Sequence, residues 1–179
     1  MEIETALLKE HSKKQCLRIV KWVGADTLKF KELMKCFLEG EYRVAQRAAW
    51  PVSYCVEAHP ELIKPYFKKL VEKLNDPNLP EAVPRNTIRL FQEVEIPEKW
   101  EGQVMDYCFK AISSPTSPIA VKAFSIRVLE NLSEKYPDIL QELKTIIEER
   151  WDQETPAFKS RGRKILKKID RLLPSKFSH

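Results

Sequence analysis

Glycine is scarce in this sequence, with four glycines in 179 residues. Sheets joined by tight turns and loops that cradle phosphate both depend on glycine for close backbone approach and positive φ. No G-x-G-x-x-G, Walker A or G-x-S-x-G motif occurs, so the common nucleotide-binding loops and the nucleophile elbow are excluded. The low glycine content therefore favours an all-helical protein.

Cysteine and histidine are also few and lie far apart in the sequence. The four cysteines are Cys16, Cys36, Cys55 and Cys108. They form no C-x-x-C pair, and the chain is not a small secreted scaffold. We therefore interpret them as reduced core residues. The three histidines are His11, His59 and His179. None belongs to an H-E-x-x-H pattern, so we expect neither a metal nor another cofactor.

Long apolar runs and a secretory signal are absent as well. The first four residues, MEIE, are acidic and lack the basic and apolar regions of a signal peptide. No run approaches the roughly 20 apolar residues that a membrane-spanning helix needs. We therefore expect a cytoplasmic protein that does not enter a membrane.

The sequence does contain an internal repeat. Its four copies are residues 45–52 (AQRAAWPV), 83–90 (VPRNTIRL), 121–128 (VKAFSIRV) and 158–165 (FKSRGRKI). Successive copies begin 38, 38 and 37 residues apart. A fixed period of this size is typical of stacked helix pairs. We therefore predict one all-α domain over residues 1–179, built from four helix pairs and an N-terminal helix.

Apolar spacing and helix-terminating residues predict the bounds of these helices. Apolar residues three and four positions apart predict a helix over residues 3–23. Asp26 or Thr27 caps the next helix, which ends at Gly40, and its partner covers residues 43–58. The first helices of the later pairs are expected over residues 61–75, 98–112 and 138–151.

Aligned positions of the four copies differ in their expected roles. Small residues, which allow neighbouring helices to approach closely, occupy one column: Ala49, Thr87, Ser125 and Gly162. Aliphatic columns beside it predict the buried stripe. The opposite face is mixed basic and apolar, and we expect Trp50, Ile88 and Ile126 to be exposed there beside the arginines. The alternative is that these three side chains pack against the adjacent turn.

Positive charge is concentrated at the end of the chain. The eight basic residues after position 158 are Lys159, Arg161, Arg163, Lys164, Lys167, Lys168, Arg171 and Lys176. With Asp170 as the only acid, this segment carries +7, and residues 1–158 carry −2 of the total +5. Such asymmetry suggests an acidic partner, nucleic acid or an anionic surface, although a solvated helix face is the commoner explanation.

Residues 43–49 (RVAQRAA) resemble the V-R-x-x-A-A opening of the second helix in HEAT repeats, and the resemblance covers residues 25 to about 174. It implies an α-α superhelix whose second helices line a concave surface. The residues that would lie on that surface and bind a partner are Arg47, Trp50, Arg85, Ile88, Arg89, Ile126, Arg127, Arg163 and Lys164.

The chain is also similar to short bacterial HEAT-like proteins, through residues 47–50 (RAAW), 122–125 (KAFS) and 163–169 (RKILKKI). Some of these carry the label adenylosuccinate lyase. That reaction needs a much longer chain and a mobile loop rich in glycine and serine, so we reject the label.

The function expected from this resemblance is that of a non-catalytic, monomeric scaffold that binds a protein partner, with no small-molecule substrate. The alternative is a nucleic-acid-binding protein, because DNA-alkylation-repair glycosylases resemble the chain in their stacked helix pairs and basic, tryptophan-bearing face. Arginines on this face would contact phosphates, and Trp50 would stack on a base. Glycosylase chemistry needs an acid on that face, and Glu130 is the one candidate.

Overall fold

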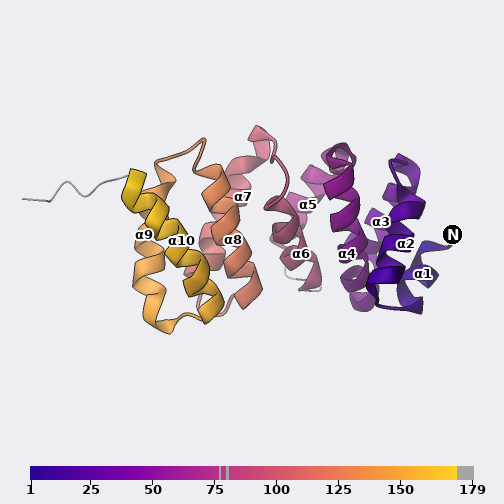
Figure 1. The fold of residues 1–179 in the computed structure, drawn as a ribbon, viewed down its shortest axis with the longest axis horizontal. Coiled ribbons are helices and arrows are strands. Elements are labelled where there is room, and N and C mark those ends of the chain that lie inside the picture. The colour runs from indigo at the N-terminus through magenta and orange to yellow at the C-terminus, as the bar shows by residue number, and fades with distance from the viewer. Residues whose placement is uncertain (77, 80, 173–179) are drawn as a thin grey trace, which may run out of the picture. The chain divides into compact units, whose positions relative to one another are not determined.

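The computed structural model describes residues 1–76, 78–79 and 81–172, and these are helical with no strand (Figure 1). The chain divides into two compact units, Met1–Trp100 and Glu101–His179. The predicted all-α fold of successive helix pairs is confirmed for the described residues.

The helices of the first unit are α1 (Ile3–Lys9), α2 (Lys13–Val23), α3 (Thr27–Glu39), α4 (Tyr42–Ala58), η1 (Pro60–Tyr66), α5 (Phe67–Leu74) and α6 (Ala82–Phe91). Helix α7 (Glu98–Ser113) begins at the end of this unit. The second unit continues with α8 (Ile119–Leu132), α9 (Ile139–Arg150), η2 (Trp151–Gln153) and α10 (Pro156–Leu172).

Two predicted helices are each divided in the structure. The N-terminal stretch is two helices, because Ser12 caps α2 and its Oγ accepts a hydrogen bond from the Gln15 amide at 3.2 Å. The stretch after Pro60 begins as the 3₁₀ helix η1 and becomes α-helical only at Phe67. Pro65 explains the second division, since it has no amide hydrogen for the helix ladder and clashes with an earlier carbonyl.

Helix α4 is the centre of the first unit and contacts α1, α2, α3, η1 and α6. Its buried face is rich in small side chains, including Ala45, Ala48 and Ala49, of which Ala49 is 3% exposed. Small side chains let several helices approach one helix closely. The sequence RVAQRAA therefore specifies a helix that is packed on several sides.

In the second unit, α10 packs on α8 and α9. It buries Phe158, Gly162, Ile165 and Ile169, whose spacing of four, three and four residues makes a single stripe. A Cβ added at Gly162 would lie 3.0 Å from a side-chain atom of Ile147. The predicted column of small residues is thus buried, and Gly162 stands at a close contact between helices.

Thr87 on α6 is fully buried, and its Oγ1 has no hydrogen-bond partner among the described residues. A buried hydroxyl without a partner costs about 1–3 kcal/mol. Valine has nearly the same shape without the polar atom, so Thr87→Val is expected to raise the free energy of unfolding by about 1 kcal/mol. Urea denaturation of both proteins measures this change, and a destabilised variant would show that the hydroxyl does find a partner.

Candidate functional site

Ile88 and Ile126, which we expected to be exposed, lie in the core. Ile88 is 0% exposed and Ile126 is 1% exposed. On α8 both Ser125 and Ile126 are buried, and so are both Val128 and Leu129, so two neighbouring stripes of this helix face inwards. A helix packed on more than one side buries a wider arc than one amphipathic stripe. The prediction that these isoleucines form an exposed apolar column is therefore wrong, and the alternative of local packing holds for them.

Arg47 and Trp50 on α4 hold the N-terminal helices in place. The Arg47 guanidinium donates hydrogen bonds through Nη1 to the carbonyl oxygens of Leu7 and Leu8, at 3.1 and 2.8 Å. These carbonyls belong to the last turn of α1, where a helix has no partners of its own for them. Trp50 is half-buried and packs edge to face with His11, with 5.6 Å between ring centroids. Both side chains therefore contribute to the packing of the first unit.

Arg85 and Arg127 pair with acids close to them in the sequence, at the N-cap of α6 and within α8. The Arg85 Nη1 lies 3.6 Å from an Oε1 of Glu81, one turn earlier on the chain. The Arg127 Nη1 lies 2.6 Å from Oε2 of Glu130. Ion pairs of this kind at a surface contribute little to stability, typically below about 1 kcal/mol. The second of these ion pairs involves Glu130, the acid that glycosylase chemistry would need.

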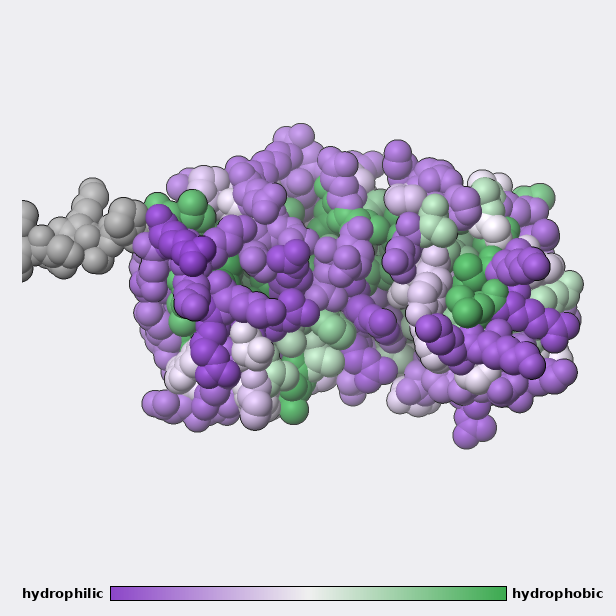
Figure 2. Space-filling view, in the orientation of Figure 1, coloured by the Kyte–Doolittle hydropathy of each residue, from purple (hydrophilic) through white to green (hydrophobic). Residues whose placement is uncertain are grey.

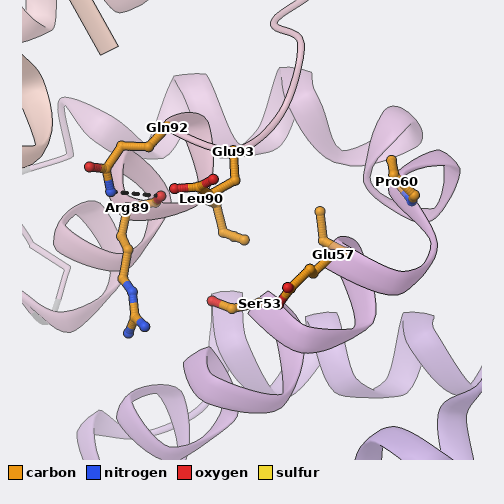
Figure 3. A pocket seen from close by; sticks show the side chains of 8 residues that line it. Ser53, Glu57, Pro60, Arg89, Leu90, Gln92 and Glu93 are labelled. Atoms are coloured by element: carbon orange, nitrogen blue, oxygen red, sulfur yellow. Dashed lines mark hydrogen bonds between the residues drawn. The ribbon is translucent and has the colours of Figure 1, made fainter. Parts of the chain in front are cut away.

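Arg89 is exposed and lies at a groove in the first unit, shown in Figure 3. The groove has a volume of about 350 Å³ and runs between the last turns of α4 and α6. Its floor includes Val56 and Leu90, which are 2% and 3% exposed. Polar groups surround the floor: Ser53, Glu57, Arg89, Gln92 and Glu93.

The two sides of the groove come from different helices. In Figure 3, Ser53 and Glu57 lie across the opening from Leu90 and Glu93. Gln92 donates a hydrogen bond from Nε2 to the backbone oxygen of Arg89 at 3.1 Å. This bond does not involve the guanidinium of Arg89. No ion pair of Arg89 occurs within residues 1–76, 78–79 and 81–172. The groove therefore combines an apolar floor with one exposed cation and two exposed carboxylates.

Arg163 and Lys164 lie on a basic, exposed face of α10. Figure 2 shows hydrophilic side chains along this helix. The Arg163 guanidinium lies over the Trp151 ring, 5.9 Å from its centroid. Lys164 is exposed, as are Lys167 and Arg171 on the same helix. Lys176, which also belongs to the predicted basic segment, lies outside the described residues.

A buried ionic cluster in the second unit was missed by the sequence analysis. Lys122 is 4% exposed and Glu154 is 8% exposed, and Lys122 Nζ lies 2.6 Å from Glu154 Oε1. Arg150 donates to the same oxygen from Nε at 2.9 Å and from Nη2 at 2.7 Å. Its Nη1 also donates to the Ser113 carbonyl at 3.0 Å. The sequence does contain a signal for the buried position of Lys122, because it lies four residues before Ile126 and therefore on the same stripe of α8.

The two buried carboxylates of the second unit are both held as anions. Burial raises the pKa of Glu154, but hydrogen bonds from Lys122 and Arg150 outweigh it and the pKa lies below its ordinary value. Burial likewise raises the pKa of Glu101, and hydrogen bonds from Tyr136 and Lys135, at 2.5 and 2.9 Å, bring it below its ordinary value. A general acid needs the opposite shift, so neither group is tuned for that role.

The described part of the chain has neither a group of three metal-ligating residues nor a helix able to span a membrane. No three His, Cys, Asp or Glu residues there are grouped so that they could hold a metal ion. None of the described helices is long and apolar enough to cross a membrane.

The paired helices and the period of about 38 residues define a helical repeat protein. A family model for the HEAT repeat domain matches residues 3–169, so the chain belongs to the HEAT repeat family. The match includes α1 and α2, which the sequence resemblance had left out. No curated protein and no solved structure matches the chain. HEAT repeats are helical scaffolds that typically mediate interactions.

Proposed function

We propose that this chain is a non-catalytic scaffold that binds a protein partner in the groove between α4 and α6. The observation that carries the proposal is Arg89, exposed beside an apolar floor made by Val56 and Leu90. Protein interfaces combine an apolar centre with a polar rim, and arginine is enriched among their energetically dominant residues. Membership of the HEAT repeat family supports the same general role.

The groove also suits a polypeptide better than a small metabolite. Its rim bears charges of both signs, from Glu57, Arg89 and Glu93. An extended segment can place an apolar side chain on the floor and satisfy these charges with its own side chains. Small-molecule sites are lined predominantly by apolar side chains with a few polar groups, whereas five of the eight residues that line this groove are polar or charged.

Reversing the charge at Arg89 is expected to weaken partner binding. Arg89→Glu places a third carboxylate beside Glu57 and Glu93 and removes the only cation of the rim. We expect the affinity for the partner to fall about tenfold or more, which is at least about 1.4 kcal/mol. A quantitative pull-down from cell extract, followed by binding measurements with the purified partner, tests this expectation.

Arg18→Glu on α2 is the matched control, because Arg18 is exposed, belongs to the same unit and does not line the groove. Both variants change the net charge by the same amount. The proposal requires that Arg18→Glu keep the partners of the wild type. If both variants recover the same partners in the same amounts as the wild type, the groove is not the binding site.

A further inference from the structure

Helix α10 has a row of cations on its exposed face, and its opposite face is packed in the core of the second unit. Phe158, Ile165 and Ile169 are 0% exposed, so the opposite face of the helix is fixed in the core of the second unit. The exposed face carries Arg163, Lys164, Lys167 and Arg171. Arg171 lies eight residues after Arg163, which is about 12 Å along a helix at 1.5 Å per residue.

The nearby acids do not neutralise this row. Asp170, the acid within α10, accepts a hydrogen bond from Lys144 of α9 at 2.8 Å. Glu134 lies 3.5 Å from Lys168, on the flank of the helix. No ion pair involves the four cations of the row among the residues that the structure describes. Four like charges on one helix face repel one another, and an anionic ligand would relieve that repulsion.

The row lacks the features that a protein or a membrane would use. The one exposed large hydrophobic side chain on the described part of α10 is Leu172, at the end of the helix. At about 100° per residue it lies off the face that carries the row, so the row itself has no anchor of the kind that dominates protein interfaces. A basic amphipathic helix enters a membrane surface through its apolar face, and that face of α10 is buried. A regular polyanion, which offers many charges and needs no apolar contact, fits this surface better.

We propose that α10 binds the phosphate backbone of duplex nucleic acid, independently of base sequence, through Arg163, Lys164, Lys167 and Arg171. Lysine and arginine supply the charge-assisted hydrogen bonds that phosphates accept. The Trp151 ring under Arg163 supports that guanidinium. The exposed face offers no asparagine or glutamine, the side chains that read adenine. Contacts from lysine and arginine to phosphate oxygens carry no sequence information, so binding through them follows charge. The site belongs to the second unit and does not depend on the groove of the first.

Salt dependence gives the size of the expected effect. Each neutralised phosphate of a duplex contributes about −0.9 to the slope of log K against log salt concentration. Four contacts predict a slope of about −3.6, so the affinity falls roughly 150-fold between about 50 and 200 mM salt. Fluorescence anisotropy with a labelled duplex of random sequence, about 20 base pairs long, measures this slope with the full chain.

The double variant Lys164→Gln, Lys167→Gln tests the position of the site. Glutamine keeps the helix propensity while removing two charges, and the slope is expected to fall to about −1.8. The matched control is Lys31→Gln, Lys35→Gln on α3, which removes two exposed lysines from the other unit. We expect this control to bind the duplex as the wild type does, and circular dichroism checks that both variants are folded.

Three results would overturn the proposal. The first is no duplex binding at about 50 mM salt with about 100 µM protein. A second is an equal loss of affinity in both double variants, which would assign binding to net charge alone. The third is binding of polyglutamate, or of vesicles containing phosphatidylserine, that equals or exceeds duplex binding, because the ligand would then be an acidic protein or a membrane.

Discussion

Alanine in place of Glu154 is expected to lower the free energy of unfolding by about 3–5 kcal/mol, enough to unfold many domains of this size. Glu154 Oε1 accepts hydrogen bonds from Lys122 and Arg150 inside the second unit. Without the carboxylate, the Lys122 ammonium stays in the core with no counter-ion, since Lys122 is only 4% exposed. Leaving one charge of a buried pair uncompensated costs far more than the pair itself contributes.

The same carboxylate predicts how stability depends on pH. The folded-state pKa of Glu154 lies below its ordinary value of 4.5, because hydrogen bonds from Lys122 and Arg150 outweigh the effect of burial. A lowered folded-state pKa means that the stabilisation is complete above the unfolded-state pKa and is lost as the pH falls through the folded one. We therefore expect the stability of the wild type to decline below about pH 4.5. In Glu154→Gln this part of the decline should be missing.

The double variant Lys122→Met, Glu154→Leu is the control for this prediction. It replaces two of the three charged members of the cluster by apolar side chains, and replacing a buried ion pair in this way is often nearly neutral. Arg150, the third member, keeps its hydrogen bond to the Ser113 carbonyl. Its unfolding free energy, measured with urea, should therefore exceed that of Glu154→Ala. A loss below about 1 kcal/mol in Glu154→Ala would contradict the prediction, because Lys122 would then have reached water by a small rearrangement.

The sequence predicted the repeat well because its signals are local. Helix bounds follow from apolar spacing and from caps such as Asp26, whose Oδ1 accepts hydrogen bonds from the amides of Leu28 and Lys29. The small column including Ala49 and Gly162 follows from the alignment of the copies. Each of these signals depends on a few neighbouring residues, so a single sequence contains it.

The candidate sites were harder to predict, because the exposure of a side chain depends on how many other helices pack against the helix that carries it. Ile88 was assigned to the surface on the assumption of one buried stripe, whereas α6 buries Thr87 and Ile88 together. Arg47 looked like a free cation, yet its partners are carbonyls 39 and 40 residues away in the chain. Arg163 and Lys164 are exposed on α10, because this helix buries only one narrow stripe. Their role in binding a partner stays a prediction.

Leucine in place of Gly162 is expected to destabilise the second unit by about 3 kcal/mol, near the upper end of the range for overpacked cores. Gly162 lies on α10 where the chain approaches α9 and the turn after it. A Cβ there would already lie 3.0 Å from Ile147 Cγ2 and 3.0 Å from Trp151 Cζ3. The remaining carbons of leucine therefore have no space unless α10 moves away from α9.

Gly102→Leu separates overpacking from the effect of removing a glycine. Gly102 is exposed on α7, and nothing lies within 4 Å of a Cβ added there. Leucine is the better helix former by roughly 0.8 kcal/mol, so Gly102→Leu is expected to raise stability by about that amount. Gly162→Ala should change stability little, since the gain in helix propensity offsets the two tight contacts of the added Cβ with Ile147 and Trp151. Thermal unfolding of the three variants tests this order, and a Gly162→Leu variant as stable as the wild type would mean that α10 is not packed closely against α9.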